Sequence, residues 1–181
     1  MKSDAVSDKA AGVYQVTAQE LWHADRSAGP VRLKVTSDSM RPLLRAGDVV
    51  VVQPANLPAV QPGDIIVVQR GGEWITHRLV AADEHGFQTL GDNTRFADEA
   101  MSADQLVGRV LAIERTVGII DLQQPRWRTI NRRINRVQRF QLRTLTAART
   151  LGGTHSTGLT RGLAVFINWP FRLLVRMLVR S

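Results

Sequence analysis

The sequence predicts a mainly β domain followed by basic, amphipathic helices at the C-terminal end. Short β-branched segments alternate with Gly-Asp, Gly-Gly and Gly-Asp-Asn turn signals over roughly residues 15–122. Beyond Pro125 the apolar residues recur instead at helical spacing. The charge divides at the same place, since all 16 acidic residues precede residue 122 and the last 60 residues contain 12 arginines. We therefore expect a flexible N-terminus (1–14), a compact β domain (15–122) and an Arg-rich helical arm (123–181).

Alternating and β-branched segments mark the expected strands. Residues 13–21 are compatible with either a strand or a helix, whereas Val31–Val35 alternates strictly and indicates a half-buried strand. Further strands are expected at 49–52, 65–68, 74–79, 87–90, 107–113 and 117–122. Because no helical segments alternate with them, these strands predict a single all-β core.

The arm is expected to form two amphipathic segments. In the first, apolar residues recur at spacings of three, four and three, which places on one helix face Trp127, Ile130, Ile134 and Val137. After a glycine-rich break (152–158), the second segment carries arginines four residues apart, along one side of a helix that Pro170 should kink: Arg172, Arg176 and Arg180.

Several classes of protein are excluded by composition. The chain has no cysteine, which excludes disulfides, thiolate metal sites and a cysteine nucleophile. No cluster has metal-ligand spacing and no glycine-rich phosphate loop is present, so neither a metal nor another cofactor is expected. Residues 1–26 lack an apolar core of signal-peptide length, and no segment has the ~18 uncharged apolar residues of an ordinary membrane span. We expect no cleavable signal peptide.

The polar turn at residues 37–42 contains a candidate nucleophile, Ser39. A serine hydroxyl attacks weakly by itself and needs a base and oxyanion donors. His77 is the candidate base, since the unperturbed pKa of histidine lies near neutrality. Its strand also places it beside Ile75 and Leu79, so a hydrogen-bonded core histidine is the alternative. A carboxylate could orient the imidazole, and Asp92 and Asp98 are the candidates; both could equally be turn residues.

These segments, in this order, carry a family resemblance. The stretch Ser37-Asp-Ser-Met-Arg-Pro-Leu-Leu-Arg-Ala-Gly-Asp48 resembles the nucleophile box of type I signal peptidases and of the related SOS-repressor-type self-cleaving proteases. Residues 75–80, Ile-Thr-His-Arg-Leu-Val, resemble the archaeal and endoplasmic-reticulum-type signal peptidases, which have a histidine where the bacterial enzymes have a catalytic lysine. Gly91-Asp-Asn93 with Asp98 matches the acidic box of that subfamily, and residues 107–110 resemble the segment after it.

The resemblance covers about residues 31–118 and implies a role for each matching residue. Ser39 would be the nucleophile, His77 the general base and Asp98 the orienting carboxylate, with Asp92 close by. The Ser39 backbone N–H and the Ser37 hydroxyl would form the oxyanion hole. The chain departs from the family in having Asp38 where a glycine is usual between the two serines. Members of the family are normally anchored by an N-terminal transmembrane helix, and we expect none here.

The sequence therefore favours a serine endopeptidase that cleaves a leader or precursor peptide at or near a membrane. The arm suggests peripheral binding to an anionic membrane surface on the cytoplasmic face, through Trp169, Arg172, Arg176 and Arg180. Helices that pack on the core or on a partner are the alternative, and the scarcity of interleaved aromatic residues disfavours nucleic acid. Two other functions remain open: a regulator that cleaves itself at Ala28–Gly29, and a non-catalytic binding module that docks through the arm.

Overall fold

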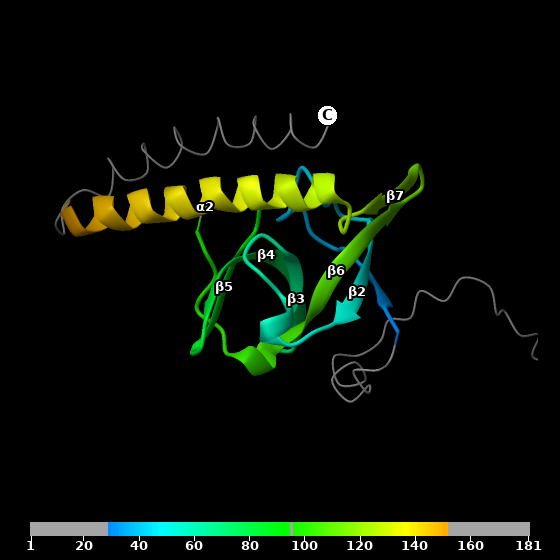
Figure 1. Ribbon diagram of the computed structural model, residues 1–181, viewed down its shortest axis with the longest axis horizontal. Helices are drawn as coiled ribbons and strands as arrows, with labels where there is room; N and C mark the ends of the chain where they lie inside the picture. The colour runs from blue at the N-terminus through cyan, green and yellow to red at the C-terminus, as the bar shows by residue number, and fades with distance from the viewer. Residues whose placement is uncertain (1–28, 95, 152–181) are drawn as a thin grey trace, which may run out of the picture.

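The computed structural model describes residues 29–94 and 96–151, with side chains as far as Arg143 (Figure 1). The expected elements at residues 13–21 and 159–181 lie outside these ranges. Seven strands are present, namely β1 (Val31–Lys34), β2 (Val49–Pro54), β3 (Ile65–Arg70), β4 (Glu73–Asp83), β5 (Gly86–Leu90), β6 (Leu106–Arg115) and β7 (Gly118–Asp121). Two 3-10 turns, η1 (Leu57–Ala59) and η2 (Ala103–Gln105), and one long helix, α2 (Pro125–Leu151), complete the described fold. The prediction of a mainly β domain followed by a helix is confirmed.

All strand pairs in the sheet are antiparallel. The strand order is β1-β2-β6-β3-β4-β5, and β7 also pairs with β6. The register shifts within the pairs β2–β6, β3–β6 and β4–β5. Such bulges bend a strand and increase its twist. Figure 1 shows the resulting curved sheet on one side of α2.

The central strand β3 is buried on both faces, which explains its uninterrupted β-branched sequence. Ile65 and Val67 pack in one apolar cluster, together with side chains from β2, β6 and the loop between β1 and β2. Ile66 and Val68 point the other way, into a second cluster that includes Leu79 and Phe87. The sheet therefore separates two hydrophobic cores.

Helix α2 packs on the first of these cores. Trp127, Ile130 and Ile134 are buried there, and Val137 packs partly against it, so the helical face predicted from their spacing is confirmed. Burial of one large apolar side chain contributes about 1.5–3 kcal/mol. The first turns of the arm are thus an integral part of the packed domain.

Candidate active site

The loop between β1 and β2 carries Ser39 and is anchored at both ends of its turn. Met40, Leu43 and Leu44 are at most 1% exposed and fix the loop in the first core. Asp48 accepts the Arg45 backbone N–H at 2.9 Å and pairs with Arg115 through Nε at 2.9 Å and Nη2 at 2.8 Å. At the N-terminal end of the loop, the Val35 backbone N–H donates to Asp48 O at 2.8 Å. Ser39, between Val35 and Met40, is thus held at the surface in a defined position and remains partly exposed.

His77 lies on β4 within reach of that serine. Its Nε2 is 3.1 Å from Ser39 Oγ, and its Nδ1 is 2.6 Å from Asp98 Oδ2. Because a carboxylate only accepts, Nδ1 carries the proton and Nε2 is left to accept the Ser39 hydroxyl. His77 is 6% exposed and lies on the face of β4 that also carries Leu79. The structure thus places a hydroxyl, an imidazole and a carboxylate in one hydrogen-bonded row.

Asp98 is held by neighbours on β5. The Thr89 hydroxyl donates to Oδ2 of Asp98, the Asp98 backbone N–H donates to Thr89 O at 2.9 Å, and Gln88 Nε2 donates to Asp98 O at 3.1 Å. Burial by itself would raise the pKa of Asp98. The hydrogen bonds from His77 and Thr89, aided by electrostatic interaction with His77 and Arg70, outweigh burial and lower that pKa below its ordinary value. Asp98 therefore stays ionised beside His77.

The lowered pKa of Asp98 predicts an acid-dependent contribution to stability. A carboxylate with a folded-state pKa below its unfolded value of about 4 stabilises the fold fully above that pH, and the contribution is lost as the pH falls through the folded pKa. We expect the difference in unfolding free energy between wild type and Asp98→Asn to be constant near neutrality and to shrink below about pH 4. Urea unfolding of both proteins from pH 7 to pH 3 measures this. A difference that does not change with pH would contradict the ionised Asp98.

A turn at residues 91–93 supports Ser39 from the other side. The Asn93 backbone N–H donates to Ser39 O at 2.7 Å, and Asn93 Nδ2 donates to Asp38 O at 3.2 Å. Gly91 is required here because a Cβ at this position would lie 2.8 Å from Ser39 O and 2.9 Å from His77 Nε2. The turn therefore lies directly against the Ser39–His77 contact.

Asp92 has a different set of partners from Asp98. Its carboxylate accepts Arg78 Nε at 2.8 Å and Arg78 Nη2 at 2.7 Å, and both side chains are 0% exposed. Gln138 Nε2 donates to the same carboxylate at 2.9 Å. Of the two candidate carboxylates, Asp98 is therefore hydrogen-bonded to His77, and Asp92 is paired with Arg78. Successive side chains of a strand point to opposite faces, so His77 and the next residue, Arg78, point to opposite faces of β4. Asp92, the partner of Arg78, therefore lies on the other side of β4 from the His77 imidazole.

The remaining residues of the nucleophile loop are also placed. Ser37 Oγ lies 3.2 Å from Ser39 Oγ. The Asp38 carboxylate accepts the Ala46 backbone N–H at 3.1 Å and Arg41 Nη1 at 3.2 Å. The side chain that replaces the usual glycine is thus engaged within its own loop and not with Ser39.

The expected membrane-binding residues Trp169, Arg172, Arg176 and Arg180 lie outside the described residues. In the described part of the chain, no helix has the length and apolar character needed to cross a membrane. Across residues 29–94 and 96–151, histidine and acidic side chains form no group of three that could hold a metal ion.

Comparison with known proteins identifies the family of the chain. The sequence profile of the Peptidase S24-like family matches residues 4–111, more than half of the chain. The chain belongs to the Peptidase S24-like family. The matched span of this Peptidase S24-like chain includes Ser39, His77 and Asp98. A search of curated proteins gave no significant match.

Sequence reasoning missed the residues that support this row. Thr89 is one of many strand threonines, and nothing in the sequence distinguishes it. Arg78 did carry a signal, because a charged residue in an otherwise apolar strand must find a partner if it is buried. The helix residues that meet the Arg78–Asp92 pair, Asn131 and Gln138, lie within an arginine-rich stretch that suggested a solvated surface.

Proposed function

We propose that the protein is a serine endopeptidase in which Ser39 attacks the peptide bond, His77 is the general base and Asp98 orients His77. The observation that carries this proposal is the row of contacts Ser39 Oγ–His77 Nε2 (3.1 Å) and His77 Nδ1–Asp98 Oδ2 (2.6 Å). The alternative of a merely structural core histidine is less consistent with Nε2 facing a partly exposed serine. Membership in the Peptidase S24-like family supports the same reaction class.

The proposed mechanism uses these contacts for an ordered set of proton transfers. Ser39 Oγ bonds to the substrate carbonyl carbon while His77 Nε2 takes its proton, and the carbonyl oxygen becomes an oxyanion. The Ser39 backbone N–H and the Ser37 hydroxyl are the donors proposed for that oxygen. His77 then protonates the leaving amine as the peptide bond breaks. Water, deprotonated by His77, hydrolyses the acyl-enzyme, and the proton returns to Ser39.

The use of a histidine as the base supports a more specific proposal, namely a mechanism like that of one subfamily. The sequence resembles the archaeal and endoplasmic-reticulum-type signal peptidases at residues 75–80, where a histidine replaces the lysine of the bacterial enzymes. An imidazole that receives a proton gains from a nearby carboxylate, which a lysine base does not require. Asp98 supplies that carboxylate here. We therefore propose a mechanism like that of the histidine-type subfamily, acting on a leader or precursor peptide.

Covalent labelling with a fluorophosphonate tests the proposal. We expect one adduct, located on Ser39 by peptide mapping, with labelling at least 100-fold slower in His77→Ala. Ser37→Ala is the comparison variant for the site of labelling: it leaves the proposed nucleophile but removes a proposed oxyanion donor, so it should be labelled more slowly than wild type and still on Ser39. A wild-type protein that remains unlabelled, or labelling that His77→Ala does not slow, would contradict the assignment.

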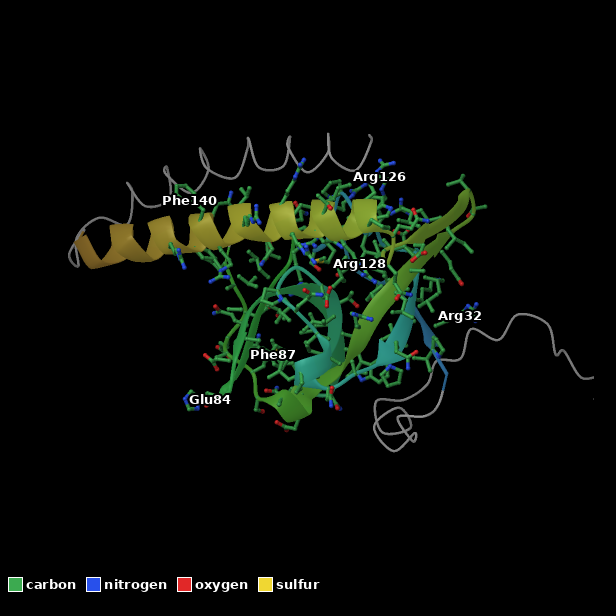
Figure 2. All side chains as sticks on the ribbon, in the orientation of Figure 1. Arg32, Glu84, Phe87, Arg126, Arg128 and Phe140 are labelled. Atoms are coloured by element: carbon green, nitrogen blue, oxygen red, sulfur yellow. The ribbon has the colours of Figure 1, made fainter. Side chains whose placement is uncertain are left out.

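We also propose that the enzyme binds peripherally to an anionic membrane surface, on the cytoplasmic face. The described part of α2 contains no acidic residue, and its seven arginines with described side chains are all exposed: Arg126, Arg128, Arg132, Arg133, Arg136, Arg139 and Arg143. None of the seven forms an ion pair within residues 29–94 and 96–143. Phe140, 66% exposed, points away from the sheet, as does Arg126 (Figure 2). Such a face suits anionic headgroups.

Vesicle flotation of the full chain tests this surface. Near an anionic leaflet each arginine contributes about 1 kcal/mol, so the triple variant Arg133→Gln/Arg136→Gln/Arg143→Gln should bind phosphatidylserine vesicles roughly 100-fold more weakly. The matched control is Lys34→Gln/Arg41→Gln/Arg45→Gln, which removes the same charge from the β domain. Equal loss in both variants, or equal wild-type binding to neutral phosphatidylcholine vesicles, would contradict a specific basic face.

Self-cleavage at Ala28–Gly29 is the second candidate function, and the family match favours it because residues 4–111 include this bond. Gly29 precedes β1, which runs through four residues paired with β2 before the chain reaches the Ser39 loop. Attack within the same molecule would therefore require the start of the chain to fold back along β1. Intact mass after prolonged alkaline incubation distinguishes the two functions: loss of residues 1–28 in wild type but not in Ser39→Ala indicates self-cleavage.

A further inference from the structure

We infer that helix α2 positions the candidate nucleophile through a buried polar chain that runs from Asn131 and Gln138, by way of Arg78 and Asp92, to Ser39. The inference rests on the proposed function, because it assigns the helix a part in the reaction of that site. It gives α2 two separate roles on two faces: the arginine face toward solvent and an amide face toward the active site.

The first link is the docking of α2 on a buried ion pair. Arg78 and Asp92 are both 0% exposed and form two parallel hydrogen bonds. Each member of the pair forms a hydrogen bond with one side-chain amide of the helix. Arg78 Nη1 donates to Asn131 Oδ1 at 2.8 Å, and Gln138 Nε2 donates to Asp92 Oδ1 at 2.9 Å. Asn131 and Gln138 are seven residues apart, which puts them two turns apart on one helix face.

The polar character of this face indicates a specific docking position. A helix that only covers a core would present apolar side chains throughout its buried face, yet four amides of α2 are at most 7% exposed: Asn131, Asn135, Gln138 and Gln141. A buried ion pair whose remaining polar atoms lack partners is costly. The hydrogen bond that Asn131 accepts from Arg78 and the one that Gln138 donates to Asp92 therefore favour one register of the helix on the sheet over neighbouring ones.

The second link connects the ion pair to Ser39. Asp92 is the middle residue of the 91–93 turn, and its backbone N–H contacts Met40 Sδ at 3.4 Å. On one side Asn93 donates from its backbone to Ser39 O at 2.7 Å. On the other side Gly91 is closely packed, because a Cβ at this position would lie 2.8 Å from Ser39 O and 2.9 Å from His77 Nε2. A shift of Asp92 is thus transmitted to both partners of the proposed proton transfer.

Four helix variants of the full chain test the inference. Gln138→Met and Asn131→Leu remove one hydrogen bond each with little change of volume. Asn131→Asp keeps the acceptor for Arg78, and Gln138→Asn keeps the amide but withdraws it by one methylene. Asn135→Leu is the matched control, because Asn135 lies on the same buried face and forms no hydrogen bond to Arg78 or Asp92 in the described structure.

Two readouts, both at a temperature where each variant is folded, separate positioning from a general loss of stability. We expect the maximal rate of Ser39 phosphonylation to fall at least tenfold in Gln138→Met and Asn131→Leu, with the half-saturating probe concentration unchanged. Asn131→Asp and Asn135→Leu should stay within about threefold of wild type, and Gln138→Asn should lose activity. Should Gln138→Met fail to fold, Gln138→Asn and Asn131→Leu carry the test.

The second readout does not depend on catalysis. Hydrogen exchange of the Asn93 amide, which donates to Ser39, should be at least tenfold faster in Gln138→Met than in Asn135→Leu, with amides of β6 unchanged. Equal phosphonylation rates and equal Asn93 exchange in these two variants would overturn the inference. A wild-type protein that the phosphonate does not label overturns the proposed function instead. In that case, hydrogen exchange of the Asn93 amide decides by itself whether α2 holds the Ser39 loop.

Discussion

Replacement of Ser39 by alanine is expected to reduce peptide hydrolysis by on the order of 10⁵-fold, because it removes the atom that forms the acyl-enzyme. The hydroxyl contributes little to the fold, since Ser39 is partly exposed and the loop is anchored by Met40, Leu43 and Leu44. Steady-state hydrolysis of a peptide library, with thermal unfolding as the check on folding, measures the effect.

Ser37→Ala is the control for that experiment. Ser37 Oγ lies 3.2 Å from Ser39 Oγ, so its loss perturbs the same surface without removing the nucleophile. If Ser37 is only an oxyanion donor, the loss should be about 10²–10³-fold, smaller than that of Ser39→Ala. Equal activity of wild type and Ser39→Ala would leave the site without a nucleophile and end the assignment.

Replacement of Asp98 by asparagine is the second large effect, with an expected loss of roughly 10³–10⁴-fold in the maximal rate. Asparagine keeps the shape but removes the charge that stabilises the protonated imidazole and sets its tautomer. The pKa of Asp98 is lowered by hydrogen bonds from His77 and Thr89 that prevail over burial, so the charge is present throughout the neutral range. Rates measured at saturating peptide from pH 5 to pH 9 detect the loss.

Thr89→Val provides the graded comparison for Asp98. It keeps the carboxylate and removes one of its donors, and a single hydrogen bond is worth about 1 kcal/mol. We therefore expect a loss of less than about tenfold. If Asp98→Asn lost no more activity than Thr89→Val, the carboxylate would be a structural acceptor and His77 would act without it.

The strands and the helix were predictable because each has a local signal. The alternation of Val31–Val35 and the β-branched segments of β2 and β3 follow from burial of one or both faces of a sheet. The spacing of Trp127, Ile130 and Ile134 follows from the helical repeat in the same way. Both signals depend only on neighbours in sequence.

The pairing of Ser39 with His77 depended on the resemblance, since the two residues are 38 positions apart. Residue spacing could not choose between Asp92 and Asp98, and only the resemblance favoured Asp98, because the outcome depends on which side of β4 each carboxylate meets. His77 and Arg78 are adjacent and point to opposite faces, so each selects a different aspartate. A sequence that places two carboxylates six residues apart does not reveal that division.

The docking of α2 was the least predictable feature. Its arginines suggested a solvated or membrane-binding helix, and those with described side chains are indeed exposed. The amides on the opposite face gave no hydrophobic signal, although they are almost completely buried. The burial of Asn131 and Gln138 is explained by the ion pair of Arg78 and Asp92 beneath them, with which both form hydrogen bonds.

A crystal structure of the protein treated with a peptide boronate tests the central claim most directly. The account predicts a covalent bond from boron to Ser39 Oγ, with His77 Nε2 within hydrogen-bonding distance of the adduct and Asp98 still on His77 Nδ1. One boronate oxygen should point toward the Ser39 backbone N–H. A boronate bound to another residue, or a Ser39 adduct with the imidazole turned away from it, would contradict the proposed proton transfer.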